Sequence, residues 1–142
     1  MLEIKNNKIV MVLEFLRNDL VTEESMENIH RMRIVKNLEK YAETLEEERV
    51  EIIKKYAEKD ENGEVIQSDE GNITIHDSNG LNAQLDALLG ETYTIENKNL
   101  KTAIHTIAQL VKNHKGKLSG DSGEAHYILA EELEPYIEEE VE

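Results

Sequence analysis

The chain has 142 residues, a length that suits one domain with its own core. It contains no cysteine, one proline and 33% charged residues, and its formal net charge at pH 7 is −15. The lack of cysteine excludes disulfides, thiolate metal ligands and cysteine catalysis, and the charge content favours long solvated helices. The apolar run at residues 9–13 is too short for a signal peptide or a membrane span. We therefore expect a cytoplasmic protein without a membrane partner.

The negative charge is concentrated in the second part of the chain. Residues 1–59 carry 11 basic and 13 acidic residues, a net charge of −2, whereas residues 60–142 carry 5 and 18, a net charge of −13. Such a surface repels phosphates, which predicts that the protein does not bind nucleic acid directly. The charge either keeps the protein soluble or competes for a basic protein partner.

Residues 1–59 predict a hairpin of two helices. Asn6 or Asn7 can cap a first helix that ends near residue 20, and Thr22 can cap a second helix that ends near residue 58. Apolar residues recur along the second helix at steps of three and four, with Arg49 interrupting one step; they are Ile34, Leu38, Tyr41, Leu45, Ile52 and Tyr56. A helix of about 55 Å must fold back on a neighbour, pair with another chain or break near residues 26–32. We expect this stripe to be an interaction surface and the protein to be a homo-oligomer.

Residues 60–98 are rich in turns and predict a small antiparallel β insertion. Two β-like runs, at residues 64–67 and 72–76, flank a hairpin turn across residues 68–71. A short helix at residues 81–89 is expected to end at Gly90, and residues 91–96 alternate like a third strand.

Residues 99–134 predict two C-terminal helices. The first is capped by Asn99 and ends near Lys112, and the second runs from about residue 123 to 134. Pro135 ends or bends that helix, and residues 135–142 form an acidic tail. The chain is therefore expected to be a single α+β domain that is mainly helical.

The sequence SGDSGEAH at residues 119–126 contains Gly-Asp-Ser-Gly, which surrounds the nucleophilic serine of trypsin-like proteases. A serine nucleophile needs a base, a group that orients the base and N–H donors for the oxyanion. In those proteases the groups converge from two β-barrels, which this short helical chain cannot build. We predict instead that Asp121 or Ser122 caps the last helix.

The Asp- and Asn-rich residues 60–80 do not have the spacing of a calcium-binding EF-hand loop. If the loop starts at Asp60, Val65 takes the place of the required glycine, and if it starts at Asp77, Leu81 takes a ligand position. Turns explain these residues better, although an opportunistic calcium site stays open. The five histidines form no HxxxH pair. We predict no catalytic residue, no metal site and no cofactor.

A basic segment lies near the start of the long helix and contains Arg31, Arg33, Lys36 and Lys40. The last three are spaced three and four residues apart and share one helix face. They can pair with acidic neighbours, namely Glu27, Glu39 and Glu43, or with an acidic partner subunit. No aromatic residue interleaves the segment to stack on bases, so we favour these ion pairs over nucleic-acid contact.

Three segments lie along the chain at residues 2–16, 56–77 and 118–134; they are LEIKNNKIVMVLEFL, YAEKDENGEVIQSDEGNITIHD and LSGDSGEAHYILAEELE. In this order they resemble an uncharacterised family of small phage and prophage proteins from Gram-positive bacteria. The resemblance implies a phage-encoded accessory protein. It implies no reaction type, because the family has no assigned catalytic residue.

Two hypotheses follow for the function. The first is a non-enzymatic phage accessory protein, either a small virion or assembly component or a self-associating factor, which binds another phage or host protein. It would act in the host cytoplasm or on the virion. The second is an acidic anti-defence inhibitor that occupies the basic cleft of a host nuclease. Besides the apolar stripe, the predicted interaction surface includes an acidic cluster of Glu131, Glu132 and Glu134.

Overall fold

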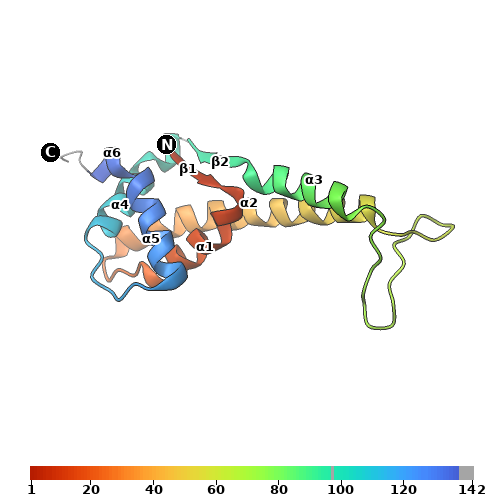
Figure 1. Cartoon of the computed structure of the whole chain (residues 1–142). Coiled ribbons are helices and arrows are strands. Elements are labelled where there is room, and N and C mark those ends of the chain that lie inside the picture. The colour runs from red at the N-terminus through yellow and green to blue at the C-terminus, as the bar shows by residue number, and fades with distance from the viewer. Residues whose placement is uncertain (97, 138–142) are drawn as a thin grey trace.

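The computed structural model describes residues 1–96 and 98–137, and it confirms the expected mainly helical α+β fold. In chain order the labelled elements are β1 (Leu2–Lys5), α1 (Ile9–Glu14), α2 (Ser25–Tyr56), α3 (Ser78–Gly90), β2 (Thr92–Ile95), α4 (Lys101–Lys112), α5 (Gly120–Glu132) and α6 (Glu134–Ile137). Figure 1 shows a compact head and a long projection. We call α3 and residues 42–56 of α2 the arm, residues 57–77 at its end the tip, and the rest the head.

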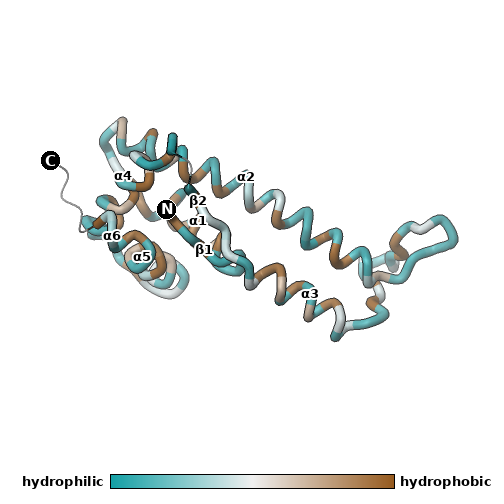
Figure 2. Tube along the Cα trace, turned by 90° about the horizontal axis from the view of Figure 1, so that it is seen from above, coloured by the Kyte–Doolittle hydropathy of each residue, from teal (hydrophilic) through white to brown (hydrophobic). Residues whose placement is uncertain are grey.

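The head is held together by a cluster of twenty buried apolar residues. Most of α4's contribution comes from Ala103, Ile104, Ile107 and Val111, whose spacing of one, three and four residues places them on one helix face. That face packs against the first half of α2, while α5 packs against α1 and α4. In the head, α1 and α4 therefore cover the inner side of α2, whereas in the arm α2 lies beside α3 (Figure 2).

The predicted first helix is broken into three short parts. A 3-10 turn at Asn6–Lys8 leads into α1, and a π-helical turn at Phe15–Asp19 follows. Asn6 does not cap a helix, so that prediction was wrong: its side chain is buried, and its amide nitrogen donates to the carbonyl oxygen of Leu88 at 2.8 Å.

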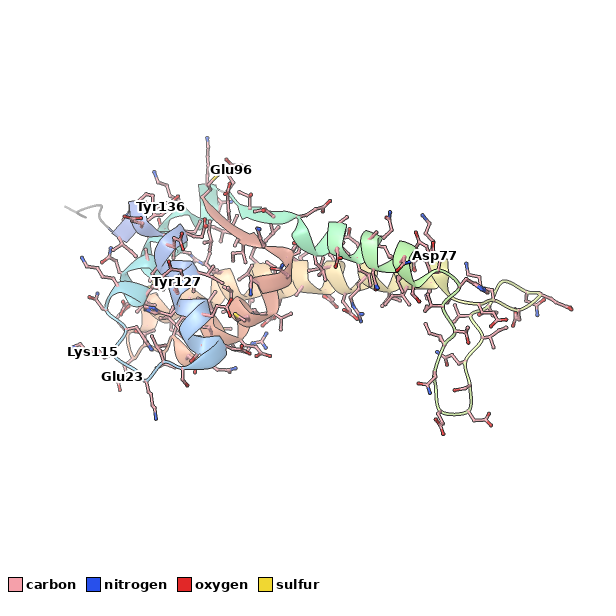
Figure 3. All side chains as sticks on the ribbon, viewed as in Figure 1. Glu23, Asp77, Glu96, Lys115, Tyr127 and Tyr136 are labelled. Atoms are coloured by element: carbon pink, nitrogen blue, oxygen red, sulfur yellow. The ribbon has the colours of Figure 1, made fainter. Side chains whose placement is uncertain are left out.

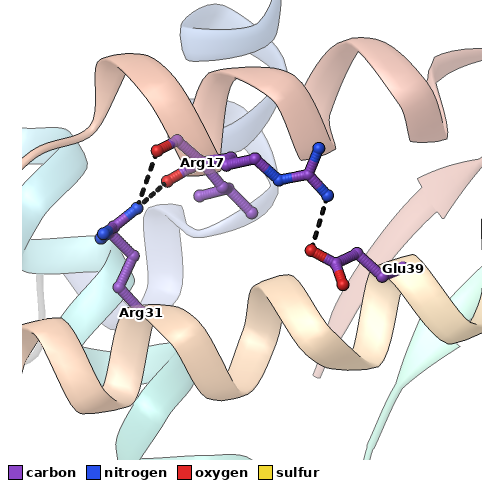
Figure 4. Close-up of polar contacts among 4 residues, drawn as sticks. Arg17, Arg31 and Glu39 are labelled. Atoms are coloured by element: carbon purple, nitrogen blue, oxygen red, sulfur yellow. Dashed lines mark hydrogen bonds and ion pairs between the residues drawn. The ribbon is translucent and has the colours of Figure 1, made fainter.

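Arg31 on α2 holds the end of this N-terminal segment. Its guanidinium donates to the carbonyl oxygens of Leu16 and Arg17 at 2.6 and 3.1 Å, and Arg17 in turn pairs with Glu39 at 2.5 Å (Figure 4). Carbonyl groups at a helix end lack intrahelical partners, and the arginine supplies donors for two of them. Arg31 therefore has a structural role, since it holds the N-terminal segment against α2.

The long helix α2 is continuous over 32 residues, about 48 Å at 1.5 Å per residue, and does not break near residues 26–32. Its N-cap is Glu24, not Thr22 as predicted. The Glu24 carboxylate accepts hydrogen bonds from the backbone N–H groups of Glu27 and Met26 at 2.6 and 3.1 Å. These bonds stabilise the charged form and lower the pKa of Glu24.

The sheet has two strands and joins distant parts of the chain. The strand predicted at residues 91–96 forms β2, but its antiparallel partner is β1, with Leu2 opposite Ile95. The predicted β insertion was therefore wrong in its pairing. Leu2, Ile4 and Ile95 are buried. A four-residue strand at the chain start carries too short an alternation to be recognised in the sequence.

Three helix starts differ from the predictions, and at two of them an earlier residue is the N-cap. Asp77 caps α3 by accepting from the Gly80 N–H at 2.9 Å, so α3 begins at Ser78. A 3-10 turn at Lys98–Leu100 precedes α4. Ser119 is the N-cap of α5, which begins at Gly120.

Part of the predicted acidic tail belongs to the fold. Pro135 lies in α6, and Tyr136 and Ile137 pack against the head cluster. The N-terminal amine of Met1 also donates to the Tyr136 hydroxyl. Residues 138–142 lie outside the described residues.

Candidate protein-binding surface

The apolar stripe predicted as an interaction surface is covered within the single chain. Ile34 and Leu38 are 0% exposed and belong to the head cluster, and Leu45 is 7% exposed in the arm. The prediction was wrong for these three residues, because α4 and α3 supply the cover that the short first helix could not. Farther along the arm, Ile52 and Tyr56 are half-buried.

Tyr41, also from the predicted stripe, belongs to a polar junction between the head and the arm. Its ring stacks on Tyr93 of β2, with centroids 3.7 Å apart and planes inclined by 8°. The Tyr41 hydroxyl donates to Asn6 Oδ1 at 2.7 Å, and the Tyr93 hydroxyl donates to Asn37 Oδ1 at 2.6 Å. Because Asn6 also donates to Leu88 of α3, one network ties β2, α2, α3 and the chain start together. Partial burial raises the pKa of both tyrosines.

The tip consists of two hairpin turns. Asp60 Oδ1 accepts from the N–H groups of Asn62 and Glu64 at 2.9 and 3.0 Å, and Ser68 Oγ accepts from the Asn72 N–H at 3.1 Å. Gly63 and Gly71 close the two turns, each with a φ of +80°, which side chains disfavour. The hairpin predicted across residues 68–71 is confirmed, whereas the one across residues 60–63 was not predicted.

Pairing in the tip is sparse. Only single bridges join its backbone segments, opposing Ala57 to Ile75, Lys59 to Val65, and Gln67 to Ile73. Asp60 and Ser68 shape their own turns, as the sequence predicted for the residues rich in Asp, Asn and Gly. The tip thus keeps its form through hydrogen bonds within its turns and between its segments, for example from the Glu58 N–H to the Thr74 carbonyl oxygen at 2.8 Å. None of its residues belongs to the head cluster.

The surface of the tip is strongly acidic and partly apolar. Residues 57–77 contain seven acidic residues and one lysine. Ile66 is 43% exposed, and Val65, Ile73 and Ile75 are half-buried. Figure 3 shows side chains projecting from the tip, beyond the labelled Asp77 at its base. These apolar residues lie in the two predicted β-like runs, 64–67 and 72–76, but their partial exposure was not predicted.

A hollow of about 460 Å³ separates the tip from the last turns of α2. Its walls carry both charge signs and comprise Glu51, Lys54, Lys59, Gly63, Glu64, Val65 and Gln67. A polar, open hollow of this kind suits a peptide segment of a partner better than a buried small molecule.

The predicted acidic cluster lies at the opposite end of the molecule from the tip, where α5 meets α6 (Figure 1). Glu131, Glu132 and Glu134 are exposed. Partial burial, with the nearby charges of Glu3 and Glu131, raises the pKa of Glu132. The structure does not bring this cluster together with the apolar stripe, so the two halves of the predicted surface are separate.

Ser122 is part of a helix start. Its hydroxyl donates to the Ser119 carbonyl oxygen at 2.9 Å and accepts from the Ser119 N–H at 3.2 Å. Within residues 1–96 and 98–137, no group of three His, Asp or Glu side chains has a geometry that could hold a metal ion.

One hydroxyl–imidazole pair is close enough to suggest an activated nucleophile. His30 Nδ1 lies 2.7 Å from Thr106 Oγ1, next to a hollow of about 410 Å³ between α2 and α4. The Thr106 hydroxyl, however, donates its proton to the Thr102 carbonyl oxygen at 3.1 Å. With the Thr106 hydroxyl donating to Thr102, the matching tautomer of His30 donates to Thr106, and a donating nitrogen cannot act as a base towards that hydroxyl. The pair joins two helices.

Comparisons of the chain with protein-family models, curated proteins and solved structures found no match. The resemblance to small phage proteins therefore stays a prediction. No helix in the described part of the chain combines the length and the apolar character needed to cross a membrane.

Proposed function

We propose that this protein is a non-enzymatic accessory protein that acts by binding other protein chains, and that the tip is its main binding element. The observation that carries the proposal is the construction of the tip: turn hydrogen bonds shape it, an arm of two helices projects it, and the head cluster does not need it. An exposed isoleucine among acidic side chains suits an apolar contact ringed by charges.

The resemblance of the sequence to small phage proteins supports a phage-encoded component of the virion or of its assembly. Such a protein works in the host cytoplasm or on the virion, and its partner is another phage or host protein. An elongated shape with a separate head supports a connecting role, since the head and the tip can contact different chains.

The acidic charge of the tip supports a second candidate, an anti-defence inhibitor that occupies the basic cleft of a host nuclease. Seven acidic residues against one lysine in residues 57–77 give it the charge that such a cleft would attract. If the protein is such an inhibitor, its binding to the nuclease should weaken steeply as the salt concentration rises. A contact centred on Ile66 predicts little salt dependence.

Replacing residues 58–76 with a short glycine-rich loop tests the proposal. The His76 N–H donates to the Tyr56 carbonyl oxygen at 3.0 Å, so the ends of α2 and α3 are close enough for such a loop. We expect unchanged head stability and loss of the proteins that co-purify with the wild type from producing cells. A control variant, Tyr127→Ser, changes a head residue that is 67% exposed and should keep those partners. Retention of every partner by the shortened variant would contradict the proposal.

A further inference from the structure

A row of side chains runs along α2 on the face opposite the core, and we call it the outer row. Its members follow at alternating steps of four and three residues, the heptad spacing found in paired helices. They are Ile29, Arg33, Lys36, Lys40, Glu43, Glu47, Val50 and Lys54. All are exposed except Val50, which is half-buried. The chain therefore leaves the outer row uncovered along nearly the whole helix.

The charges of the outer row are segregated. Arg33, Lys36 and Lys40 are consecutive members, and Glu43 and Glu47 follow them. Like charges three or four residues apart repel each other on a single helix. Across the described residues, none of these five side chains forms an ion pair, although Arg49–Glu46 and Lys54–Glu51 pairs lie on the same helix. The segregated charges of the outer row therefore do not stabilise α2 as a single helix.

Of the three acidic neighbours predicted to neutralise the basic segment, Glu27 and Glu39 have other partners, and Glu43 forms no ion pair within the described residues. Glu39 pairs with Arg17 at 2.5 Å, and Glu27 accepts from the Thr22 hydroxyl at 3.1 Å. The remaining alternative from the sequence is an acidic partner subunit.

We propose that two copies of the chain pair through their outer rows, with the two α2 helices side by side and antiparallel. A two-fold axis between residues 41 and 42 places Lys40 opposite Glu43 and Lys36 opposite Glu47, and symmetry forms each pair twice. The axis lies near the midpoint of Ser25–Tyr56, so the helices overlap over almost their full length. A parallel pair would place like charges together, which selects the antiparallel arrangement.

The same register also gives suitable neighbours to the residues at the two ends of the outer row. Arg33 lies level with Val50 of the second copy, and Ile29 lies level with Lys54, so apolar side chains meet the aliphatic stems of long basic ones. Because half of these contacts are exposed ion pairs, the dimer should be modest in affinity and weaken as salt rises. Apart from Lys54, which also lines the hollow beside the tip, this pairing uses a different surface from the tip and does not depend on the tip's partner.

Charge reversal tests the pairing. We expect the wild type to sediment as a dimer at 100 micromolar protein in low salt, with roughly tenfold weaker association when salt rises through physiological strength. Lys36→Glu with Lys40→Glu makes one row wholly acidic between residues 36 and 47, and Glu43→Lys with Glu47→Lys makes it wholly basic. Each double variant should remain monomeric, and an equimolar mixture should form a heterodimer. Circular dichroism checks that both variants stay helical.

A matched control reverses two exposed lysines in the head loop, Lys115→Glu with Lys117→Glu, and should leave the dimer intact. A wild-type monomer under the low-salt conditions would overturn the proposal. So would a mixture of the two double variants that associates no better than either alone, because complementary rows are then not the contact.

Distances between spin labels test the orientation without altering the outer row. The chain has no cysteine, so Thr44→Cys or Lys55→Cys gives one label per chain, and both positions are exposed beside the row. The proposed axis separates the two copies of position 44 by about 8 Å along the helix and those of position 55 by about 40 Å, at 1.5 Å per residue. Similar short distances at both positions would show a parallel pair and overturn the proposal.

Discussion

The head and the arm share helix α2 but bury it differently. In the head, α4 and the N-terminal segment cover α2, and twenty apolar residues form one cluster. The four buried apolar residues outside that cluster, Leu45, Ala57, Leu81 and Leu88, lie in the arm and the tip. Since apolar burial is the main favourable term in folding, the head holds most of the stability. The arm is freer to present surfaces to other chains.

A pair of leucine truncations gives the largest expected difference between the two regions. Leu38→Ala in the head should cost about 3–5 kcal/mol, because a fully buried leucine leaves a cavity that its neighbours cannot fill. Leu88→Ala in the arm should cost about 2 kcal/mol, because the two-helix arm can relax around a side chain at its edge. Urea unfolding monitored by circular dichroism measures both. Equal losses would show that the arm is packed as tightly as the head.

The junction between the two regions should show the next largest effect. Asn6→Ala removes the partner of both the Tyr41 hydroxyl and the Leu88 carbonyl oxygen, which should cost about 1–3 kcal/mol. Tyr41→Phe removes only one of these hydrogen bonds and should cost about 1 kcal/mol. If the network acts as a unit, the double variant should lose less than the sum of the two losses. Strict additivity in urea unfolding would contradict a shared network.

The sequence predicted the parts of the fold that local patterns encode. The steps of four and three in Ile34, Leu38, Tyr41 and Leu45 predicted a long helix with an inward face. Ser68 and Gly71 predicted a hairpin turn. What covers that helix depends on α3 and α4, which are distant in sequence, so the stripe was mistaken for an interaction surface. The pairing of β1 with β2 and the burial of Asn6 are also long-range, and no local pattern specifies them.

The candidate site was only partly predictable for the same reason. The sequence showed acidic residues between positions 60 and 80, but not that an arm projects them from the head. The acidic cluster at Glu131 was recognised from composition, and its separation from the tip needed the fold.

Ser122→Ala tests whether the SGDSG segment is a helix start, and we expect it to reduce the stability of the head less than the substitutions above. The substitution removes the hydroxyl that bridges the N–H and carbonyl groups of Ser119, and it should cost about 1 kcal/mol or less. Any activity or partner binding should be unchanged. Complete loss of a catalytic activity in a variant that keeps its circular dichroism spectrum would show that Ser122 is a nucleophile.

The smallest expected effect is the pH dependence of the α2 N-cap. The pKa of Glu24 is lowered in the folded state from its ordinary value of 4.5 by hydrogen bonds from Glu27 and Met26. Its carboxylate therefore stabilises the fold above pH 4.5, and this contribution is lost as the pH falls through the lowered pKa. The melting temperature of Glu24→Gln should lie below that of the wild type at pH 7 and approach it at low pH. If the difference in melting temperature between the two proteins widened as the pH fell, the Glu24 carboxylate would not stabilise the fold in the way described.

Site-specific photo-crosslinking tests most directly whether the tip carries the binding function. A photoreactive amino acid replaces either Ile66 on the tip or Tyr127 on the head, residues that are 43% and 67% exposed. Illumination of the cells that produce the protein should attach a specific partner chain at position 66, while position 127 gives none or a different one. Capture of the same partner at position 127 alone, with none at position 66, would place binding on the head and contradict the account.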